Sequence, residues 1–299
     1  MNILKPFFKL MWSQTDKADQ RRIASQTPPD DVETVINIPY IEDNNKYHLL
    51  DVYYPKGNRD KLPVIIDIHG GGWWYGTKEI NKNYCMVLAQ RGFVVVNINY
   101  RLVDGVIFVE QLRDIFSALK WVDENIDRYN GDRENIFLTG DSAGGQMCLL
   151  TAQFNTSEEE KKKLLLEDND IKFKAAAVTS PAVDLVSPNI TMNANLTSLL
   201  GTYKHKSSQH YYLMDFENVA TKDFPPLYIV TSSGDFLRGQ SHKLDKILTS
   251  LNVEHRLRDF TEKYNGKKLG HVFSVIDPFI PPSVKVINEL TGFFKSHQD

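Results

Sequence analysis

Residues 140–144 read Gly-Asp-Ser-Ala-Gly and match the Gly-x-Ser-x-Gly pattern that holds a nucleophilic serine. A serine hydroxyl attacks a carbonyl carbon only when the backbone projects it toward a neighbouring base. Here a short apolar run, Ile136–Thr139, precedes the motif, and a helix-forming run, Ala143–Phe154, follows it. A strand, a sharp turn and a helix in this order predict that Ser142 is a nucleophile.

Residues 69–72 read His-Gly-Gly-Gly and directly follow a second apolar run, Val64–Ile68. Successive glycines let backbone N–H groups approach a bound oxygen, because no Cβ atom stands in the way. Donors fixed in this manner stabilise the oxyanion of an acyl-transfer intermediate. Because this loop and the serine motif occur together and in the expected order, we interpret them as two parts of one acyl-transfer site.

Such a site also needs a base and a carboxylate that orients it. In hydrolases with the Gly-x-Ser-x-Gly turn, the acid follows the serine in the chain and the histidine comes last. Asp235 lies just past the apolar run Leu227–Thr231, in a loop that contains a glycine, and parallel sheets place functional residues in such loops. His271 lies in the loop before the last helix-forming run. We therefore predict that Asp235 orients His271 and that His271 is the base.

The remaining acids and histidines fit these roles less well. Three histidines precede Asp235, and the others fall in a helix, in a strand or in the tail. The competing residues are Asp215, Asp223, Asp245, Asp259, His48, His205, His210, His242, His255 and His297. No cluster of His, Cys, Asp and Glu has the spacing of a metal site, so we expect neither a metal nor a cofactor.

The elements that would position these residues alternate from residue 32 onward. Short runs rich in Val and Ile are typical of strands buried on both faces of a parallel sheet, and the amphipathic runs between them indicate helices. A short polar turn joins the first two strands, which predicts an antiparallel hairpin. The expected strands are Val32–Tyr40, Tyr47–Tyr54, Val64–Ile68, Phe93–Ile98, Ile136–Thr139, Ala175–Thr179, Leu227–Thr231 and Val253–Phe260, and the expected helices are Glu79–Arg91, Phe108–Arg128, Ala143–Phe154, Gln240–Leu251 and Ser283–Ser296. This order predicts an α/β fold with a mostly parallel, eight-stranded sheet and helices on both faces.

The composition narrows the class of protein. The chain has 299 residues, of which 41% are hydrophobic and 24% charged, and its formal net charge is −3. It is too apolar to be intrinsically disordered, and it lacks the basic excess of a nucleic-acid-binding protein. No Pro-rich or Gly/Ser-rich linker divides it, so we expect a single domain over residues 1–299.

Two segments fall outside the alternating pattern, residues 1–31 and residues 184–223. In the first, a helical face could dock on the protein, cover a substrate pocket or lie on a membrane surface. That face would be formed by Leu4, Phe7, Phe8, Met11 and Trp12. The second is long for a connection in a compact domain, and such insertions are often lids or binding loops.

These motifs resemble those of the hormone-sensitive-lipase-like carboxylesterases of the α/β-hydrolase superfamily. The matching segments are His69–Gly72, Tyr100–Leu102, Gly140–Gly145 and Asp235–Arg238. The resemblance implies that Ser142 is the nucleophile, His271 the base and Asp235 the orienting acid. It further implies that the backbone N–H groups of Gly71, Gly72 and Ala143 form the oxyanion hole, and that residues 1–31 and 184–223 form a small helical cap.

The sequence departs from the family pattern at positions that carry no catalytic group. The family usually has glycine after the catalytic histidine, where Val272 stands here. Gly239 stands where a second aspartate is frequent, and Val103-Asp104 replaces the usual Pro-Glu after Tyr-Arg-Leu. Because these positions lie near the expected pocket rim, they bear on the substrate class.

The predicted function is that of a serine carboxylesterase that cleaves small, short-chain acyl esters, such as acetyl esters, through an acyl-enzyme on Ser142. The expected substrate-binding residues are the aromatic residues Trp73, Trp74, Tyr211 and Tyr212. One alternative is an amidase that resembles kynurenine formamidases, because residues 69–73 also fit the pattern His-Gly-Gly-x-Trp. Another is a non-catalytic ligand receptor on the same fold, which a complete triad argues against.

The expected partner is therefore a small-molecule ester and not a nucleic acid. Two cysteines, Cys85 and Cys148, lie in apolar runs and are expected to be buried and reduced, which favours a cytoplasmic location. No apolar run approaches the roughly 18 residues of a membrane-spanning helix, and the N-terminus lacks the pattern of a secretory signal. We expect no stable membrane span, and we leave a homodimer open.

Overall fold

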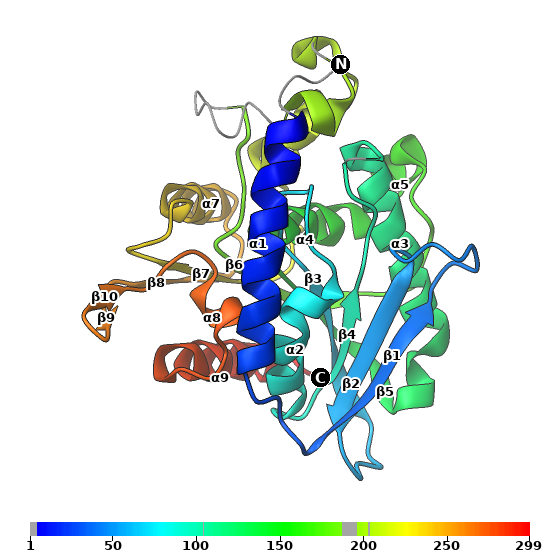
Figure 1. Cartoon of the computed structure of the whole chain (residues 1–299). Coiled ribbons are helices and arrows are strands. Elements are labelled where there is room, and N and C mark those ends of the chain that lie inside the picture. Colours follow the sequence, from blue (N-terminus) through cyan, green and yellow to red (C-terminus); the bar gives the residue numbers. More distant parts are fainter. Residues whose placement is uncertain (1–4, 104, 187–195, 203) are drawn as a thin grey trace.

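A computed structural model gives the fold and describes residues 5–103, 105–186, 196–202 and 204–299. Its centre is a sheet with strand order β1-β2-β4-β3-β5-β6-β7-β8, in which β2 runs antiparallel to both of its neighbours and the other pairs are parallel (Figure 1). The strands are β1 Val32–Pro39, β2 Leu49–Pro55, β3 Leu62–Ile68, β4 Val94–Ile98, β5 Gly131–Asp141, β6 Phe173–Thr179, β7 Leu227–Ser232 and β8 His255–Phe260. The predicted fold class is confirmed, with strand boundaries mostly within two residues of those expected.

Helices cover both faces of this sheet. Alternate residues of β3 point to opposite sides, so that Ile66 joins one hydrophobic cluster and Ile65 the other. The first cluster includes residues of α3 Phe108–Asn125, α4 Ser142–Asn155 and α7 Arg238–Ser250, and the second includes residues of α2 Lys82–Ala89, α8 Phe273–Ile276 and α9 Pro281–Lys295. Cys85 and Cys148 are buried and free, as expected.

Two predicted helices are shorter than the sequence pattern indicated. The run Glu79–Arg91 divides into the 3₁₀ turn η1 Lys78–Asn81 and α2, and Phe108–Arg128 ends as α3 at Asn125, before η2 Ile126–Tyr129. In the second case Asn130 has a φ of +58°, and this left-handed residue ends the run. The apolar periodicity of the sequence continues through these turns. Apolar spacing alone therefore does not separate an α-helix from an adjoining 3₁₀ turn, and the predicted helices are too long.

The N-terminal segment forms a long helix, α1 Lys5–Ser25, which lies outside the sheet and its flanking helices (Figure 1). We call it the covering helix. Leu4 and the side chains of Phe7, Phe8 and Met11, which the sequence places on one helical face, lie outside the described part of the chain. The side chain of Trp12, on the same predicted face, packs against the first cluster.

Residues 184–223, which we call the insertion, leave the sheet after β6. Their described part contains a helical turn at 196–200 and the 3₁₀ turns η3 His205–Ser207, η4 Tyr211–Met214 and η5 Phe216–Asn218. Lys243 of α7 binds Asp184 and Asp215 at 2.8 Å each, which links the first residue of the insertion to its later part. Next to the insertion lies α5 Glu158–Leu164, whose Lys161 is only 5% exposed and pairs with Glu158 and Asp168.

The hairpin of β9 Lys263–Tyr264 and β10 Lys267–Lys268 completes the described elements. No helix within the described residues is long and apolar enough to span a membrane.

Candidate active site

Ser142 lies at the junction of β5 and α4, where the chain turns sharply from strand to helix. Its φ of +53° is in the left-handed region, which is strained for a residue with a side chain. The turn also requires glycine at position 144, because a Cβ atom there would lie 2.1 Å from the carbonyl oxygen of Ile68. This close packing of β3 against the start of α4 leaves the serine projecting from a tight turn.

His271 connects Ser142 with Asp235. Its Nε2 atom lies 2.9 Å from the Oγ atom of Ser142, and its Nδ1 atom lies 2.7 Å from Oδ1 of Asp235. The three residues are far apart in the sequence. The ends of β5 and β7 and the loop before α8 bring them together. Neutral His271 with a proton on Nδ1 would donate to Asp235 and accept from the serine hydroxyl.

The carboxylate of Asp235 is fixed by its neighbours. The hydroxyl of Thr231 donates to Oδ2 at 2.9 Å, and the N–H of Leu237 donates to Oδ1 at 2.9 Å. Burial acts to raise the pKa of Asp235, but the hydrogen bond and charge of His271 bring that pKa below its usual value. Asp235 is therefore ionised at neutral pH and can stabilise a protonated imidazole.

Residues 69–77, which we call the glycine loop, expose backbone donors. The carbonyl oxygen of Gly71 accepts from the N–H groups of Trp74 at 3.2 Å and Tyr75 at 3.0 Å. Gly71 and Gly72 have φ values of +115° and +58°, and their own N–H groups find no acceptor among the described residues. Ala143 is in the first turn of α4, where N–H groups have no partner within the helix. These amides can therefore bind an oxyanion.

A buried polar cluster anchors the glycine loop to the serine turn. Oδ1 of Asp141 accepts from the N–H of Gly70 at 3.0 Å. The side chain of Asn81 donates to Oδ1 of Asp141 and to Oδ2 of Asp67, at 2.9 Å each. Burial, with a smaller effect of the charge of Asp141, raises the pKa of Asp67 to about 7. Asp67 and Asn81 were not identified from the sequence. An aspartate inside the apolar run of β3 is nevertheless a sign of a buried polar cluster.

His69 has a structural position. Its imidazole is buried, stacks on Tyr100 with ring centroids 4.4 Å apart, and hydrogen-bonds the carbonyl oxygen of Gly70 at 2.7 Å. Burial lowers the pKa of His69 to about 4, so this histidine is neutral at physiological pH. Its ring therefore shapes the glycine loop and takes no part in the contacts of His271.

Val272 has a backbone conformation that explains why related proteins usually have glycine at this position. Its φ of +48° is in the left-handed region, which is unfavourable for a β-branched residue. The N–H of Val272 donates to Oγ of Ser180 at 3.2 Å, and its side chain is buried in the second cluster. Contacts on both sides of the residue therefore offset the strain next to His271.

Comparison with known proteins assigns the family. The profile of the BD-FAE family matches residues 50–248. The chain belongs to the BD-FAE family. It is 28% identical to carboxylesterase NlhH of Mycobacterium tuberculosis over 229 residues, covering 72% of this chain and 69% of that protein. It is also 26% identical to versiconal hemiacetal acetate esterase of Dothistroma septosporum over 259 residues, covering 81% and 75%.

A solved structure extends the likeness over nearly the whole chain. Esterase B of Lactobacillus rhamnosis, inhibited by a C4-C4 tributyrin phosphonate, superimposes with a TM-score of 0.93 and 28% identity, covering 98% of this chain and 95% of that one. The resemblance to hormone-sensitive-lipase-like carboxylesterases is thereby confirmed, and the BD-FAE protein is a serine carboxylesterase of the α/β-hydrolase superfamily.

The aromatic residues predicted to bind substrate in this BD-FAE protein differ in their surroundings. Trp73 and Trp74 are 2% and 7% exposed and both pack in the first cluster, and Trp74 also lines a pocket beside the glycine loop. Tyr212 turns toward α5, where its hydroxyl donates to Glu160 and Lys163 lies 3.9 Å from its ring centroid. Tyr211 is partly buried against the first cluster. Contact of these four side chains with substrate stays a prediction.

The covering helix contacts the glycine loop directly. The indole of Trp12 stacks on the ring of Tyr75 with centroids 5.3 Å apart, and a Cβ atom added to Gly72 would lie 2.7 Å from it. Asp19 accepts from the hydroxyl of Tyr75 at 3.0 Å, and Arg22 donates to the carbonyl oxygen of Ile276 at 2.6 Å. Of the three readings of the N-terminal segment, these contacts favour docking that also covers the loop.

Phe236 is a further residue whose surroundings the sequence did not reveal. Its ring lies 4.2 Å from the imidazole of His271, yet the residue is 73% exposed. A large aromatic side chain in this position adds no core packing, so its surface is available to whatever approaches the histidine.

Within the described residues, no group of three or more His, Cys, Asp and Glu could hold a metal ion.

Proposed function

We propose that Ser142, His271 and Asp235 are the catalytic triad and that the enzyme hydrolyses short-chain acyl esters. The observation that carries this proposal is the continuous line from Asp235 through His271 to Ser142, with contacts of 2.7 and 2.9 Å. In it, His271 takes the proton of Ser142 as the hydroxyl attacks the carbonyl carbon, and Asp235 stabilises the resulting imidazolium.

The proposed oxyanion hole consists of the N–H groups of Gly71, Gly72 and Ala143. Donors that are fixed before the reaction stabilise the developing negative charge at little reorganisation cost. The tetrahedral intermediate collapses when protonated His271 donates to the leaving alkoxide, which releases the alcohol and leaves an acyl-enzyme. Water activated by the same histidine then attacks the acyl carbon, releasing the acid and the free serine.

Two relatives support a short acyl group. One is versiconal hemiacetal acetate esterase, and the other is esterase B, which was inhibited by a C4-C4 tributyrin phosphonate. The proposed substrate is therefore a small ester with an acetyl to butyryl group, bound over Ser142 beneath a cap formed by residues 1–31 and 184–223. In this proposal the partly buried Tyr211 has more surface to offer the ester than Trp74, which is 7% exposed.

Labelling with a fluorophosphonate tests the nucleophile. The wild-type chain should be labelled, and Ser142→Ala should lose both the label and essentially all esterase activity. Equal labelling of Ser142→Ala would refute the assignment. A series of p-nitrophenyl esters tests the acyl limit, since an optimum at long chains would contradict it. N-formylkynurenine, assayed beside an acetyl ester, tests the amidase alternative.

A further inference from the structure

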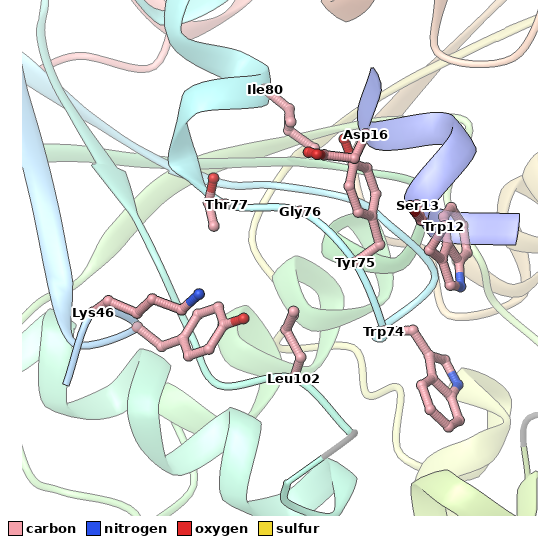
Figure 2. Close-up of a pocket in the computed structure, with 11 residues that line it drawn as sticks. Trp12, Ser13, Asp16, Lys46, Trp74, Tyr75, Gly76, Thr77, Ile80 and Leu102 are labelled. Carbon is pink, nitrogen blue, oxygen red and sulfur yellow. The ribbon is translucent and has the colours of Figure 1, made fainter. Parts of the chain in front are cut away.

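A pocket of about 510 Å³ opens beside the glycine loop, and none of the proposed catalytic residues lines it (Figure 2). It lies between the covering helix, the outer part of the loop and the turn that joins β1 to β2. Its lining residues are Trp12, Ser13, Asp16, Lys46, Tyr47, Trp74, Tyr75, Gly76, Thr77, Ile80 and Leu102. Aromatic rings and polar groups share this lining in similar measure, and the volume lies in the range of small-molecule sites.

The walls suit a flat apolar ring. Figure 2 shows the indole rings of Trp12 and Trp74 on one side of the opening and Lys46 on the other. The rings of Trp12 and Tyr75 are nearly parallel, with an interplanar angle of 6°, and together they form a stacked wall. Aromatic ligands gain stacking energy on such surfaces beyond the burial of their area.

The polar groups of the pocket suit a neutral ligand with hydroxyl groups. Lys46 lies 4.9 Å from the ring centroid of Tyr47 and pairs with no carboxylate among the described residues. Asp16 accepts a hydrogen bond from Gln20, which is uncharged, at 2.7 Å. One cation and one anion in the lining leave no net charge for an ionic ligand to balance, whereas a hydroxyl group can accept from an ammonium and donate to a carboxylate.

We propose that this pocket binds a small, neutral, hydroxylated aromatic compound and that its occupancy is coupled to the oxyanion donors. The link is short. Trp74 and Tyr75 line the pocket, and their N–H groups hold the carbonyl oxygen of Gly71. That carbonyl belongs to the same planar peptide unit as the N–H of Gly72, so its hydrogen bonds fix the direction of a proposed donor. The coupling rests on the proposed function, whereas the binding does not.

A ligand packed against the rings of Trp74 and Tyr75 would restrain the backbone segment that orients the N–H group of Gly72. The expected effect is on kcat, because the oxyanion donors act in the transition state more than in the ground state. The ligand is not consumed and forms no covalent bond. Because none of the proposed catalytic residues lines the pocket, substrate and ligand bind at the same time in this proposal.

Calorimetric titration of the full chain with 4-hydroxybenzyl alcohol tests the site. Ser13→Trp places a bulky side chain in the lining from an exposed position of the covering helix, and Gln14→Trp is its matched control on the neighbouring exposed position. Wild type and Gln14→Trp should bind the probe, and Ser13→Trp should not. Absent binding to wild type at tens of millimolar, or equal binding by both variants, would overturn the site. Tighter binding of glucose would overturn the ligand class.

Esterase assays with p-nitrophenyl acetate test the coupling. The probe should raise kcat by about two- to tenfold, a fraction of the effect of one oxyanion donor, in wild type and Gln14→Trp but not in Ser13→Trp. An unchanged or reduced kcat would overturn the coupling, and a rise in KM alone would place the probe in the ester site. A chain without esterase activity would refute the proposed function, while the calorimetry would still decide the site.

Discussion

Two regions meet at the proposed active site: the ends of β3, β5 and β7, and a proposed cover, which consists of the covering helix and the described part of the insertion. At the strand ends, backbone N–H groups and buried carboxylates fix each residue, as with Gly70 on Asp141 and Leu237 on Asp235. In the cover, contacts such as the stack of Trp12 on Tyr75 and the ion pair of Lys243 with Asp215 are made by partly exposed side chains.

This difference has consequences for how each region tolerates change. A buried carboxylate that loses its partner costs far more free energy than an exposed ion pair or a surface stack. Substitutions at the strand ends should therefore produce large losses of activity or stability. Substitutions in the cover should produce smaller effects, seen mainly in how the substrate binds.

The largest effect should come from Asp235→Asn. Loss of the carboxylate removes the partner of His271 Nδ1, so the imidazole is neither held in the required tautomer nor stabilised when protonated. We expect kcat to fall by roughly 10⁴-fold, measured with p-nitrophenyl acetate. Asp259→Asn is the matched control, since Asp259 pairs with Arg238 and His242 away from the triad. A comparable loss in the control would contradict the assignment of Asp235.

The next largest effect should be a change in the pH dependence of stability in Asp67→Asn. The pKa of Asp67 is about 7 in the folded chain and about 3.9 when unfolded, so between these values the unfolded state ionises while the folded state does not. Asp67 therefore lowers the free energy of unfolding progressively as the pH rises from about 4 to about 7. The asparagine variant lacks this loss.

Urea unfolding at several pH values measures this effect. The free energy of unfolding of Asp67→Asn, relative to wild type, should rise by up to a few kcal/mol across that interval and then stay level. Asp30→Asn, at an exposed aspartate, should follow the wild-type curve. A constant difference between Asp67→Asn and wild type at every pH would show that Asp67 has no raised pKa.

In the cover, Trp12→Ala should have a moderate effect. The variant removes the ring that stacks on Tyr75 and lies over Gly72, a contact of about 0.5–1.5 kcal/mol. We expect kcat/KM for short esters to fall by about two- to tenfold, with the free energy of unfolding less affected. Gln14→Ala, exposed on the same helix, should leave the rate unchanged. An unchanged rate for Trp12→Ala would mean that the helix docks without assisting the reaction.

The contrast between the two regions also explains what could be predicted from the sequence. The strands and the residues of the proposed triad were accessible, because buried runs and the motifs around Ser142 reflect local backbone requirements. The positions of Trp12, Phe236 and Asn81 were not, since each depends on a contact between segments distant in the chain. The left-handed φ of Val272 was visible only as a departure from the usual glycine.

Phe236 lies between the two regions, and Phe236→Ala should have a small, selective effect. Its exposed ring next to His271 would contact the leaving group of the ester. We expect kcat/KM for phenyl acetate to fall by about threefold relative to methyl acetate, which corresponds to about 0.65 kcal/mol, near the lower end of the range for aromatic pairs because the ring is exposed. Phe236→Tyr should retain the wild-type preference. Equal losses on both esters would indicate that the ring positions His271 and does not select the alcohol.

The smallest effect should come from Tyr212→Phe, which removes the hydroxyl that the cover donates to Glu160 of α5. Because this hydrogen bond is partly exposed, the free energy of unfolding should fall by about 0.5–1 kcal/mol, measured by urea unfolding. The kinetic constants should not change, since the hydroxyl faces α5 and its partner is a side chain of the protein. Tyr211→Phe is the matched control, because the hydroxyl of Tyr211 has no partner among the described residues, and its stability should equal wild type. A raised KM in Tyr212→Phe would place that hydroxyl on the substrate and would extend the binding surface of the cover as far as α5.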